Sequence, residues 1–183
     1  MNSNINILHI ETATHVCSCA LSSGKEVVFN RENYTKQSHA SSLGVFIEEA
    51  VNVARAQRLK IDAVSVSSGP GSYTGLRIGV SEAKGIAYGL NTKLIAVPTL
   101  KLLASTMASR MEKDVLLCPM IDARRMEVYT SLYTTDLEEI EATTAKIVDS
   151  ESFLKYLEKS KVAFFGDGAL KCKDIITHPN ALF

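Results

Sequence analysis

The 183-residue sequence lacks an excess of charge of either sign, because 20 lysines and arginines balance 20 aspartates and glutamates. A protein that binds nucleic acid by itself normally carries a basic face, so this balance argues against a stand-alone DNA- or RNA-binding protein. The chain also lacks an apolar run as long as a membrane span. Its first residues lead into a strand-like segment without the basic region and apolar core of a signal peptide. We therefore expect a cytoplasmic chain with no membrane partner.

Cysteines are few, and their spacing argues against two kinds of site. Cys17 and Cys19 alternate on one strand face and are too close for an ordinary bridge to each other. Cys118 and Cys172 form no second closely spaced pair that would complete a zinc site. We expect all four to be reduced thiols, as is usual in cytosolic proteins.

Several catalytic and nucleotide-binding motifs are missing. The loop over residues 69–75 reads GPGSYTG and has no lysine of a Walker-type phosphate loop. Its third glycine lies one position too late for a dinucleotide-binding fingerprint. A metallopeptidase helix would need a second metal ligand four residues after His39, where the sequence has Leu43. We therefore expect no metal site, and no histidine lies in a pattern that supports a serine or cysteine nucleophile.

What the sequence does have is a strand, loop and helix rich in glycine over residues 64–90 (VSVSSGPGSYTGLRIGVSEAKGIAYGL). A glycine inside a helix costs about 0.8–1 kcal/mol relative to alanine, so these glycines need a compensating interaction. Residues four apart share a helix face, which gives two stripes of small side chains. The stripes are Gly75, Gly79, Ala83 and Ala87, and Ser81, Gly85 and Gly89. This pattern favours close packing against another helix, whereas Gly69 and Gly71 indicate a tight turn or the approach of an anion.

The order of predicted elements repeats once along the chain. Three strands, a helix, a strand and a glycine turn occur in residues 5–71 and again in residues 115–168. Hairpins followed by alternating helix and strand predict an α/β fold of two lobes with mixed sheets. We place the lobes at residues 1–104 and 105–183. We expect the second lobe to be incomplete, because its pattern stops at Phe183 in the region that matches the glycine-rich helix.

Apolar periodicity places the individual elements. Ser38 is the expected N-cap of a helix that reaches about Arg58, and this helix has an apolar arc wide enough for two partners. The residues of that arc are Leu43, Phe46, Ile47, Ala50, Val53 and Ala54. A later helix should begin at Pro98 or Thr99, and a last one should be capped by Asp149 or Ser150. The first of these should turn Leu102, Leu103 and Met107 inward.

An acid follows the first strand of each copy, and a Gly-x-Gly pattern follows the fourth. The weak candidates for binding a nucleotide with Mg²⁺ are therefore Glu11, Asp122, Gly166 and Gly168, because hard cations bind carboxylate and phosphate oxygens. The favoured alternative is that both acids accept hydrogen bonds at strand ends, since the turns ETATH and DARR contain no glycine.

Exposed charges and aromatics offer further alternatives. Arg77 either binds an anion or a partner carboxylate, or is a solvated surface arginine. Tyr73 either anchors an interface or covers the core. For Arg124 and Glu127, a salt bridge within the chain is the default expectation.

Three segments, ILHIETAT…CSCAL, SSGPGSYTGLRIGVSEAKGIAYGL and DARRMEVY, resemble the TsaB (YeaZ) family of bacterial tRNA threonylcarbamoyladenosine biosynthesis. The resemblance covers most of the chain, although Glu11 stands where the family usually has aspartate. It implies a duplicated actin-like, ribonuclease H-like fold, and family members generally continue past the position of Phe183. It also implies a non-catalytic cytoplasmic subunit of TsaD, the related transferase that modifies the tRNA adenosine next to the anticodon.

The same resemblance implies the ATPase TsaE as a further partner, with tRNA reached only through the complex and ATP or ADP bound only there. Family dimers use the first two long helices, here 38–58 and 75–90, which implies a homodimer when the chain is alone. The expected subunit interface comprises Leu43, Phe46, Ile47, Ala50, Tyr73, Gly75, Leu76, Arg77, Gly79, Val80 and Ala83. On this basis, Gly79→Leu should weaken dimerisation and leave the monomer folded. Two other functions stay open: a phosphotransferase that binds ATP and, least favoured, a metallopeptidase.

Overall fold

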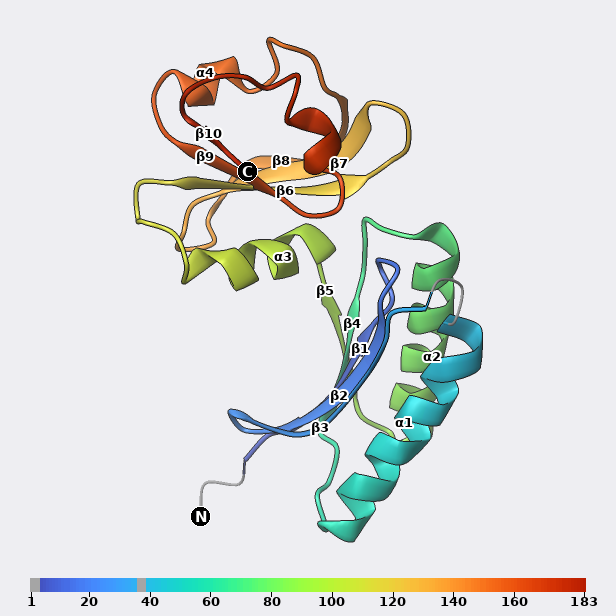
Figure 1. Cartoon of the computed structure of the whole chain (residues 1–183). Coiled ribbons are helices and arrows are strands. Elements are labelled where there is room, and N and C mark those ends of the chain that lie inside the picture. The colour runs from blue at the N-terminus through green and yellow to red at the C-terminus, as the bar shows by residue number, and fades with distance from the viewer. Residues whose placement is uncertain (1–3, 36–38) are drawn as a thin grey trace. The chain divides into compact units, whose positions relative to one another are not determined.

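The structure is a computed structural model that describes residues 4–35 and 39–183. The chain divides into two compact units, Met1–Val97 and Pro98–Phe183, coloured from blue to green and from green to red in Figure 1. The sequence-based boundary between residues 104 and 105 falls inside helix α3 (Thr99–Ala108), which packs on strands of the second unit. Ser38, the expected N-cap, lies outside the described residues.

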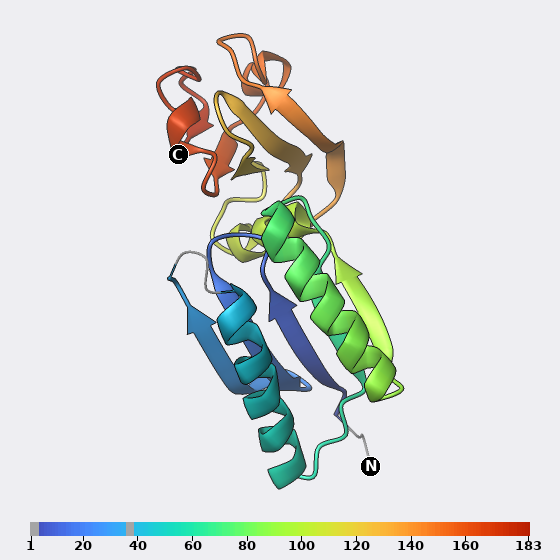
Figure 2. The same ribbon diagram turned by 90° about the vertical axis from the view of Figure 1, so that its right-hand side faces the viewer.

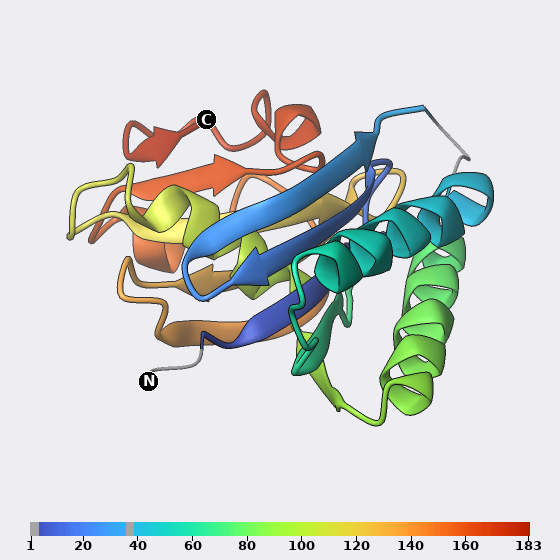
Figure 3. The ribbon, with the colours of Figure 1, turned by 90° about the horizontal axis from the view of Figure 1, so that it is seen from below.

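The first unit has a five-stranded mixed sheet and two helices. The helices lie side by side on one face of the sheet (Figures 2 and 3). The helices of the unit are α1 (His39–Ala56) and α2 (Tyr73–Gly89). Its strands are β1 (Asn6–Glu11), β2 (Cys17–Ser23), β3 (Glu26–Asn33), β4 (Ala63–Ser67) and β5 (Lys93–Val97). They lie in the order β3-β2-β1-β4-β5, in which β1 pairs antiparallel with β2 and parallel with β4.

Alternation along the strands sets the core of this unit. One face of β1, β2 and β4 packs against the helices through Leu8, Ile10, Cys17, Cys19, Leu21, Val64 and Val66. From the other side, the predicted stripe of α1 is buried against the sheet, which confirms the helical pattern. Its members are Leu43, Ile47, Ala50 and Ala54.

The second unit repeats the topology of the first. Its strands are β6 (Leu116–Asp122), β7 (Glu127–Tyr133), β8 (Glu139–Ile147), β9 (Val162–Phe165) and β10 (Ala181–Leu182). Their order β8-β7-β6-β9-β10 matches β3-β2-β1-β4-β5, and the directions match too: β6, β7 and β8 are antiparallel, whereas β9 and β10 continue parallel to β6. The shared topology confirms the predicted duplication. At the position that corresponds to α2 of the first unit, the second unit has the short 3₁₀ helix η1 (Leu170–Cys172), followed by β10.

Two helices of the second unit differ from the prediction. Helix α3 buries Leu100 and Ala104, and Leu103 and Met107 pack beside them, but Leu102 is 38% exposed. Position 102 lies two residues from 100 and 104, which puts it on the opposite side of a 3.6-residue turn.

The last predicted helix is only one turn long. It is α4 (Leu154–Leu157), and it begins after Phe153, whose φ is +68°. Asp149 caps no helix. Its Oδ1 accepts hydrogen bonds from the Glu151 amide and the Ser152 hydroxyl in the turn before α4.

The loop before α2 and the first small-residue stripe of α2 pack against a turn of their own unit. A β-carbon on Gly71 would lie 2.3 Å from the Ala13 carbonyl oxygen, and one on Gly75 would lie 2.2 Å from that of Thr12. At Gly79 it would lie 2.1 Å from Thr12 Oγ1. We call these three glycines the glycine seat, since the turn over Thr12 and Ala13 rests on them. Gly69, with a φ of +106°, provides the tight turn that precedes the seat.

This packing corrects part of the expected subunit interface. Six of those residues are buried inside the unit, namely Leu43, Ile47, Ala50, Gly75, Gly79 and Ala83. Their side chains or α-carbons are already covered by the sheet and the β1–β2 turn, so a second subunit has no access to them. For the same reason we expect Gly79→Leu to disturb the fold of the monomer, contrary to the prediction from the sequence.

Two glycines of α2 provide a matched test of the glycine seat. We expect Gly79→Ala to lower the free energy of unfolding by about 1–3 kcal/mol, because the new methyl group has no space beside Thr12. Gly85→Ala should raise it by about 0.5–1 kcal/mol, because nothing lies within 4 Å of the new β-carbon and alanine favours a helix. Urea unfolding followed by circular dichroism measures both, and equal effects at the two positions would contradict the seat.

Candidate functional site

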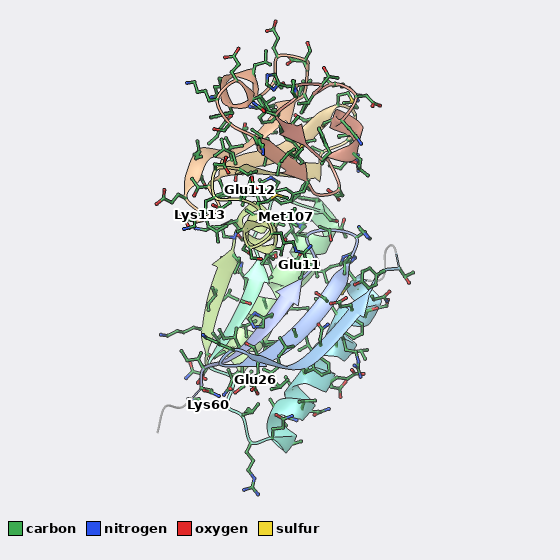
Figure 4. The ribbon with its side chains drawn as sticks, turned by 60° about the vertical axis from the view of Figure 1, so that its left-hand side comes forward. Glu11, Glu26, Lys60, Met107, Glu112 and Lys113 are labelled. Carbon is green, nitrogen blue, oxygen red and sulfur yellow. The ribbon has the colours of Figure 1, made fainter. Side chains whose placement is uncertain are left out.

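Glu11, the first candidate acid, accepts hydrogen bonds from other residues of the first unit. It ends β1, and Figure 4 shows it at the end of the sheet opposite Glu26 and Lys60. Its Oε1 accepts a hydrogen bond from the Ala13 amide at 2.6 Å, and its Oε2 accepts one from the Ser67 hydroxyl. Both carboxylate oxygens therefore have donors from the chain, which is the strand-end alternative weighed from the sequence.

The turn after Glu11 leaves little room for a phosphate group. Thr12 is fully buried, and the Ser72 amide donates to the Ala13 carbonyl at 2.6 Å. This contact and the glycine seat close the backbone of the turn onto the start of α2. The N-terminal amides of a helix can bind an anion, but here a piece of backbone lies against that end of α2.

Asp122, the second candidate acid, is paired with a lysine. Lys171 Nζ donates to Asp122 Oδ1 at 2.5 Å, to the Arg125 carbonyl at 2.8 Å and to the Glu127 carbonyl at 2.7 Å. The three protons of an ammonium group are thus all used. The hydrogen bond from Lys171 holds the pKa of Asp122 below its ordinary value. Sequence spacing does not reveal this pair, because Lys171 lies 49 positions from Asp122.

Gly166 and Gly168 are explained by packing on β6. A β-carbon on Gly166, whose φ is +103°, would lie 2.3 Å from the Met120 carbonyl oxygen. One on Gly168 would lie 2.9 Å from the Ile121 carbonyl carbon. Between them, Asp167 Oδ1 accepts from the Asp122 amide at 3.0 Å. The Gly-x-Gly pattern thus brings this loop against the strand that ends in Asp122.

The turn between β6 and β7 carries two adjacent arginines in left-handed backbone. Arg124 has a φ of +71° and Arg125 a φ of +46°. Left-handed backbone costs a residue with a β-carbon roughly 1–2 kcal/mol. The expected ion pair between Arg124 and Glu127 is not formed within the described part of the chain, where Asp122 pairs with Lys171 instead.

His39 and the cysteines have structural roles. His39 is buried, and its Nε2 lies 3.0 Å from the Thr14 carbonyl oxygen at the β1–β2 turn. All four cysteines are free and buried, and burial raises the pKa of Cys19 to about 12, which suppresses the nucleophilic thiolate. Within residues 4–35 and 39–183, no three histidine, cysteine, aspartate or glutamate side chains gather as metal ligands.

A histidine between two serines was missed by the sequence analysis. His9 Nδ1 and Nε2 each lie 2.8 Å from a hydroxyl oxygen, of Ser65 and Ser22 respectively. Burial lowers the pKa of His9, which favours the neutral ring. Only strand pairing brings these three residues together, and no sequence spacing announces it.

The outer face of α2 is the accessible part of the expected interface. Tyr73 is 74% exposed, and the Arg77 guanidinium lies 5.0 Å from the centre of its ring. Tyr88, near the other end of the helix, is 90% exposed. The second small-residue stripe also lies on this exposed face, and β-carbons on Gly85 and Gly89 would meet nothing within 4 Å. A shallow groove of about 510 Å³ runs beside it, lined by Ala40, Thr74, Arg77, Ile78, Ser81 and Glu82.

Comparison with known proteins identifies the family. Residues 26–176 match the family model described as TsaD, tRNA N6-adenosine threonylcarbamoyltransferase. The tRNA threonylcarbamoyladenosine biosynthesis protein TsaB of Bacillus subtilis is 35% identical over 70% of this chain and 55% of its own length. That of Escherichia coli is 33% identical over 72% of this chain and 56% of its own length. The chain belongs to the TsaB (YeaZ) family.

The fold agrees with that of a solved relative. A Pseudomonas aeruginosa protein described as similar to peptidase YEAZ superposes with a TM-score of 0.77 at 23% identity, covering 98% of this chain and 83% of that one. This chain spans a little over half the length of the Bacillus subtilis and Escherichia coli TsaB proteins. No helix among the described residues is long and apolar enough to cross a membrane.

The Lys171–Asp122 pair should make stability depend on pH. Because the pKa of Asp122 is lowered by folding, the pair contributes fully above the ordinary aspartate pKa of about 3.9 and is lost as the pH falls through the lowered value. We expect Lys171→Met to cost about 1–2 kcal/mol at neutral pH and less in acid. Lys173→Met, an exposed neighbour, is the matched control. Urea unfolding from pH 2 to 7 measures this, and parallel pH curves for Lys171→Met and wild type would refute the assignment.

Proposed function

We propose that this chain is a non-catalytic partner of a TsaD-type transferase in the threonylcarbamoyladenosine modification of tRNA. In this role it acts on the adenosine next to the anticodon only through that partner, which carries out the chemistry. TsaE is a third component, and ATP or ADP is bound only in the assembled complex. Membership in the TsaB family supports the process, since the relatives are named as threonylcarbamoyladenosine biosynthesis proteins.

The observation that carries the non-catalytic role is the use of both candidate acids within the fold. The two carboxylate oxygens of Glu11 accept hydrogen bonds from Ala13 and Ser67, and Asp122 forms an ion pair with Lys171. A metal-bound nucleotide would need such carboxylates to be available, because Mg²⁺ is usually held by one or two of them together with phosphate oxygens. This supports a subunit that acts by binding a partner over a phosphotransferase.

The partner surface in this proposal is the outer face of α2 with the neighbouring part of α1. Of the expected interface residues, Tyr73 and Arg77 are exposed, while Phe46, Leu76 and Val80 are half-buried. The open glycines Gly85 and Gly89 add a strip without side chains, along which the backbone of another helix can approach closely. When the chain is alone, a second copy occupies the same surface as a homodimer, and a TsaD-type partner replaces it.

Two variants test this surface without disturbing the core. We expect Gly85→Leu to block close approach and Arg77→Glu to reverse the charge beside Tyr73, and each should reduce co-purification with the TsaD-type partner at least about tenfold. Both should keep the wild-type circular dichroism spectrum, since neither residue is buried. Lys25→Glu, in the exposed β2–β3 turn, is the matched charge control and should behave as wild type.

The function itself is tested in cells from which the gene for this chain has been deleted. Loss of threonylcarbamoyladenosine from tRNA, restored by the wild-type chain and not by the Gly85→Leu chain, is the expected result. Unchanged tRNA modification in the deleted cells, together with no complex on size exclusion, would show the proposal to be wrong. Titration calorimetry of the isolated chain with ATP and Mg²⁺ separates the alternative, because measurable binding would favour a phosphotransferase.

A further inference from the structure

The Arg124–Arg125 turn has two arginines in a backbone conformation that residues with a β-carbon rarely adopt. Asparagine and glycine adopt left-handed backbone most readily, yet both positions are arginines with positive φ. They are the only adjacent pair of such residues other than glycine in the part of the chain described here. Strained backbone of this kind clusters at functional sites, so the two guanidinium groups need an explanation.

Hydrogen bonds from other groups hold the turn in its shape, and the arginine side chains are exposed. Asp122 Oδ1 accepts from the Arg124 amide at 2.9 Å, and Lys171 Nζ binds the Arg125 carbonyl. Both arginines are exposed, and neither forms an ion pair with any described residue. Hydrogen bonds of Asp122 and Lys171 therefore fix the backbone, and the charge of Arg124 adds a smaller contribution by lowering the pKa of Asp122.

The two arginines line an open depression with an apolar side. Its volume is about 520 Å³, and its lining is Ala123, Arg124, Arg125, Met126, Glu127 and Ile147. Ile147 is 73% exposed and lies directly opposite Glu127 in the pairing of β7 with β8. Guanidinium groups bind phosphates, and the methyl and thioether groups of Ile147 and Met126 offer a surface for a planar ring.

The surrounding charges indicate what strength of binding to expect. Asp122 is neutralised by Lys171, whereas Asp167 and Glu127 remain as acids close to the turn. The positive charges of the two arginines are thus offset by the negative charges of these two acids. Such a site contacts few phosphates and binds weakly and in a salt-sensitive manner when the chain is alone.

We propose that the Arg124–Arg125 turn is an RNA contact, in which the two guanidinium groups bind successive phosphates of a strand and the wall formed by Ile147 and Met126 packs against a base. The choice of RNA rests on the proposed function in tRNA modification. This site is separate from the nucleotide alternative, since it uses exposed arginines and not the Asp122 carboxylate. An acidic peptide segment of a protein partner is the competing occupant.

Nuclear magnetic resonance titration detects such weak binding directly. We expect a single-stranded RNA of about ten nucleotides to shift the amides of residues 123–127 and 147–148 of the full chain. The logarithm of its binding constant should fall with the logarithm of salt concentration with a slope of about −1.4, as two single-strand phosphate contacts require. No shift at millimolar RNA, or shifts produced equally by ATP or by polyglutamate, would overturn the proposal.

Two double variants distinguish the contribution of the arginine side chains to RNA binding from effects on the fold. Arg124→Gln with Arg125→Gln keeps the strained backbone and removes both charges, and should weaken RNA binding about tenfold. Arg124→Asn with Arg125→Gly suits the left-handed backbone, so it should abolish binding while keeping or raising the thermal midpoint. Wild-type RNA affinity in either folded variant would refute the inference.

Matched controls limit the interpretation of these variants. Arg58→Gln removes an exposed arginine that also has left-handed backbone, with a φ of +56°, and should leave RNA binding unchanged. Glu127→Gln removes the acid from the depression and should tighten binding. Equal losses in the Arg58 and Arg124 variants would indicate nonspecific charge attraction and overturn the site. The Arg124 and Arg125 variants should still co-purify with the TsaD-type partner, which distinguishes failure of this inference from failure of the proposed function.

Discussion

The contact between the Thr12–Ala13 turn and the glycine seat is the constraint on which the first unit depends. The carbonyl oxygens of Thr12 and Ala13, and the Thr12 hydroxyl, occupy the space where β-carbons of residues 71, 75 and 79 would stand. The seat fixes how closely α2 approaches the end of β1, and with it the position of Glu11 and of the outer face of α2. The free energy that helical glycine costs is recovered here inside the unit.

The two units share a topology but stabilise the equivalent turns by different physics. In the first, a backbone turn packs on glycines, and Glu11 accepts hydrogen bonds from neighbouring groups. In the second, the turn is held electrostatically by Lys171, which reaches one carboxylate and two carbonyl oxygens. Both solutions use the acid at the end of the first strand of the unit, and both take up oxygens that a bound metal–nucleotide would need.

Local sequence patterns predicted the elements and the duplication, because alternation and helical stripes report which face of an element is buried. The alternating strand Asn6–Glu11 and the stripe of α1 are examples. The same patterns could not say what a small residue packs against. The stripe through Gly79 suited a second subunit equally well, and only the fold brings Thr12, 67 positions earlier, to that helix. The candidate site was limited in the same way: Glu11 and Asp122 were found as strand-end acids, but Ser67 and Lys171 reach them through pairing distant in sequence.

The turns after Glu11 and Asp122 are filled by different groups, so they differ in how many substitutions would open a binding site there. The second turn is filled by one flexible side chain, so a single codon change at Lys171 would uncover a carboxylate and two carbonyl oxygens already pointing at one spot. The first turn is filled by main chain, which no single substitution removes. Any variant of this fold that gains a cation is therefore expected to gain it in the second unit.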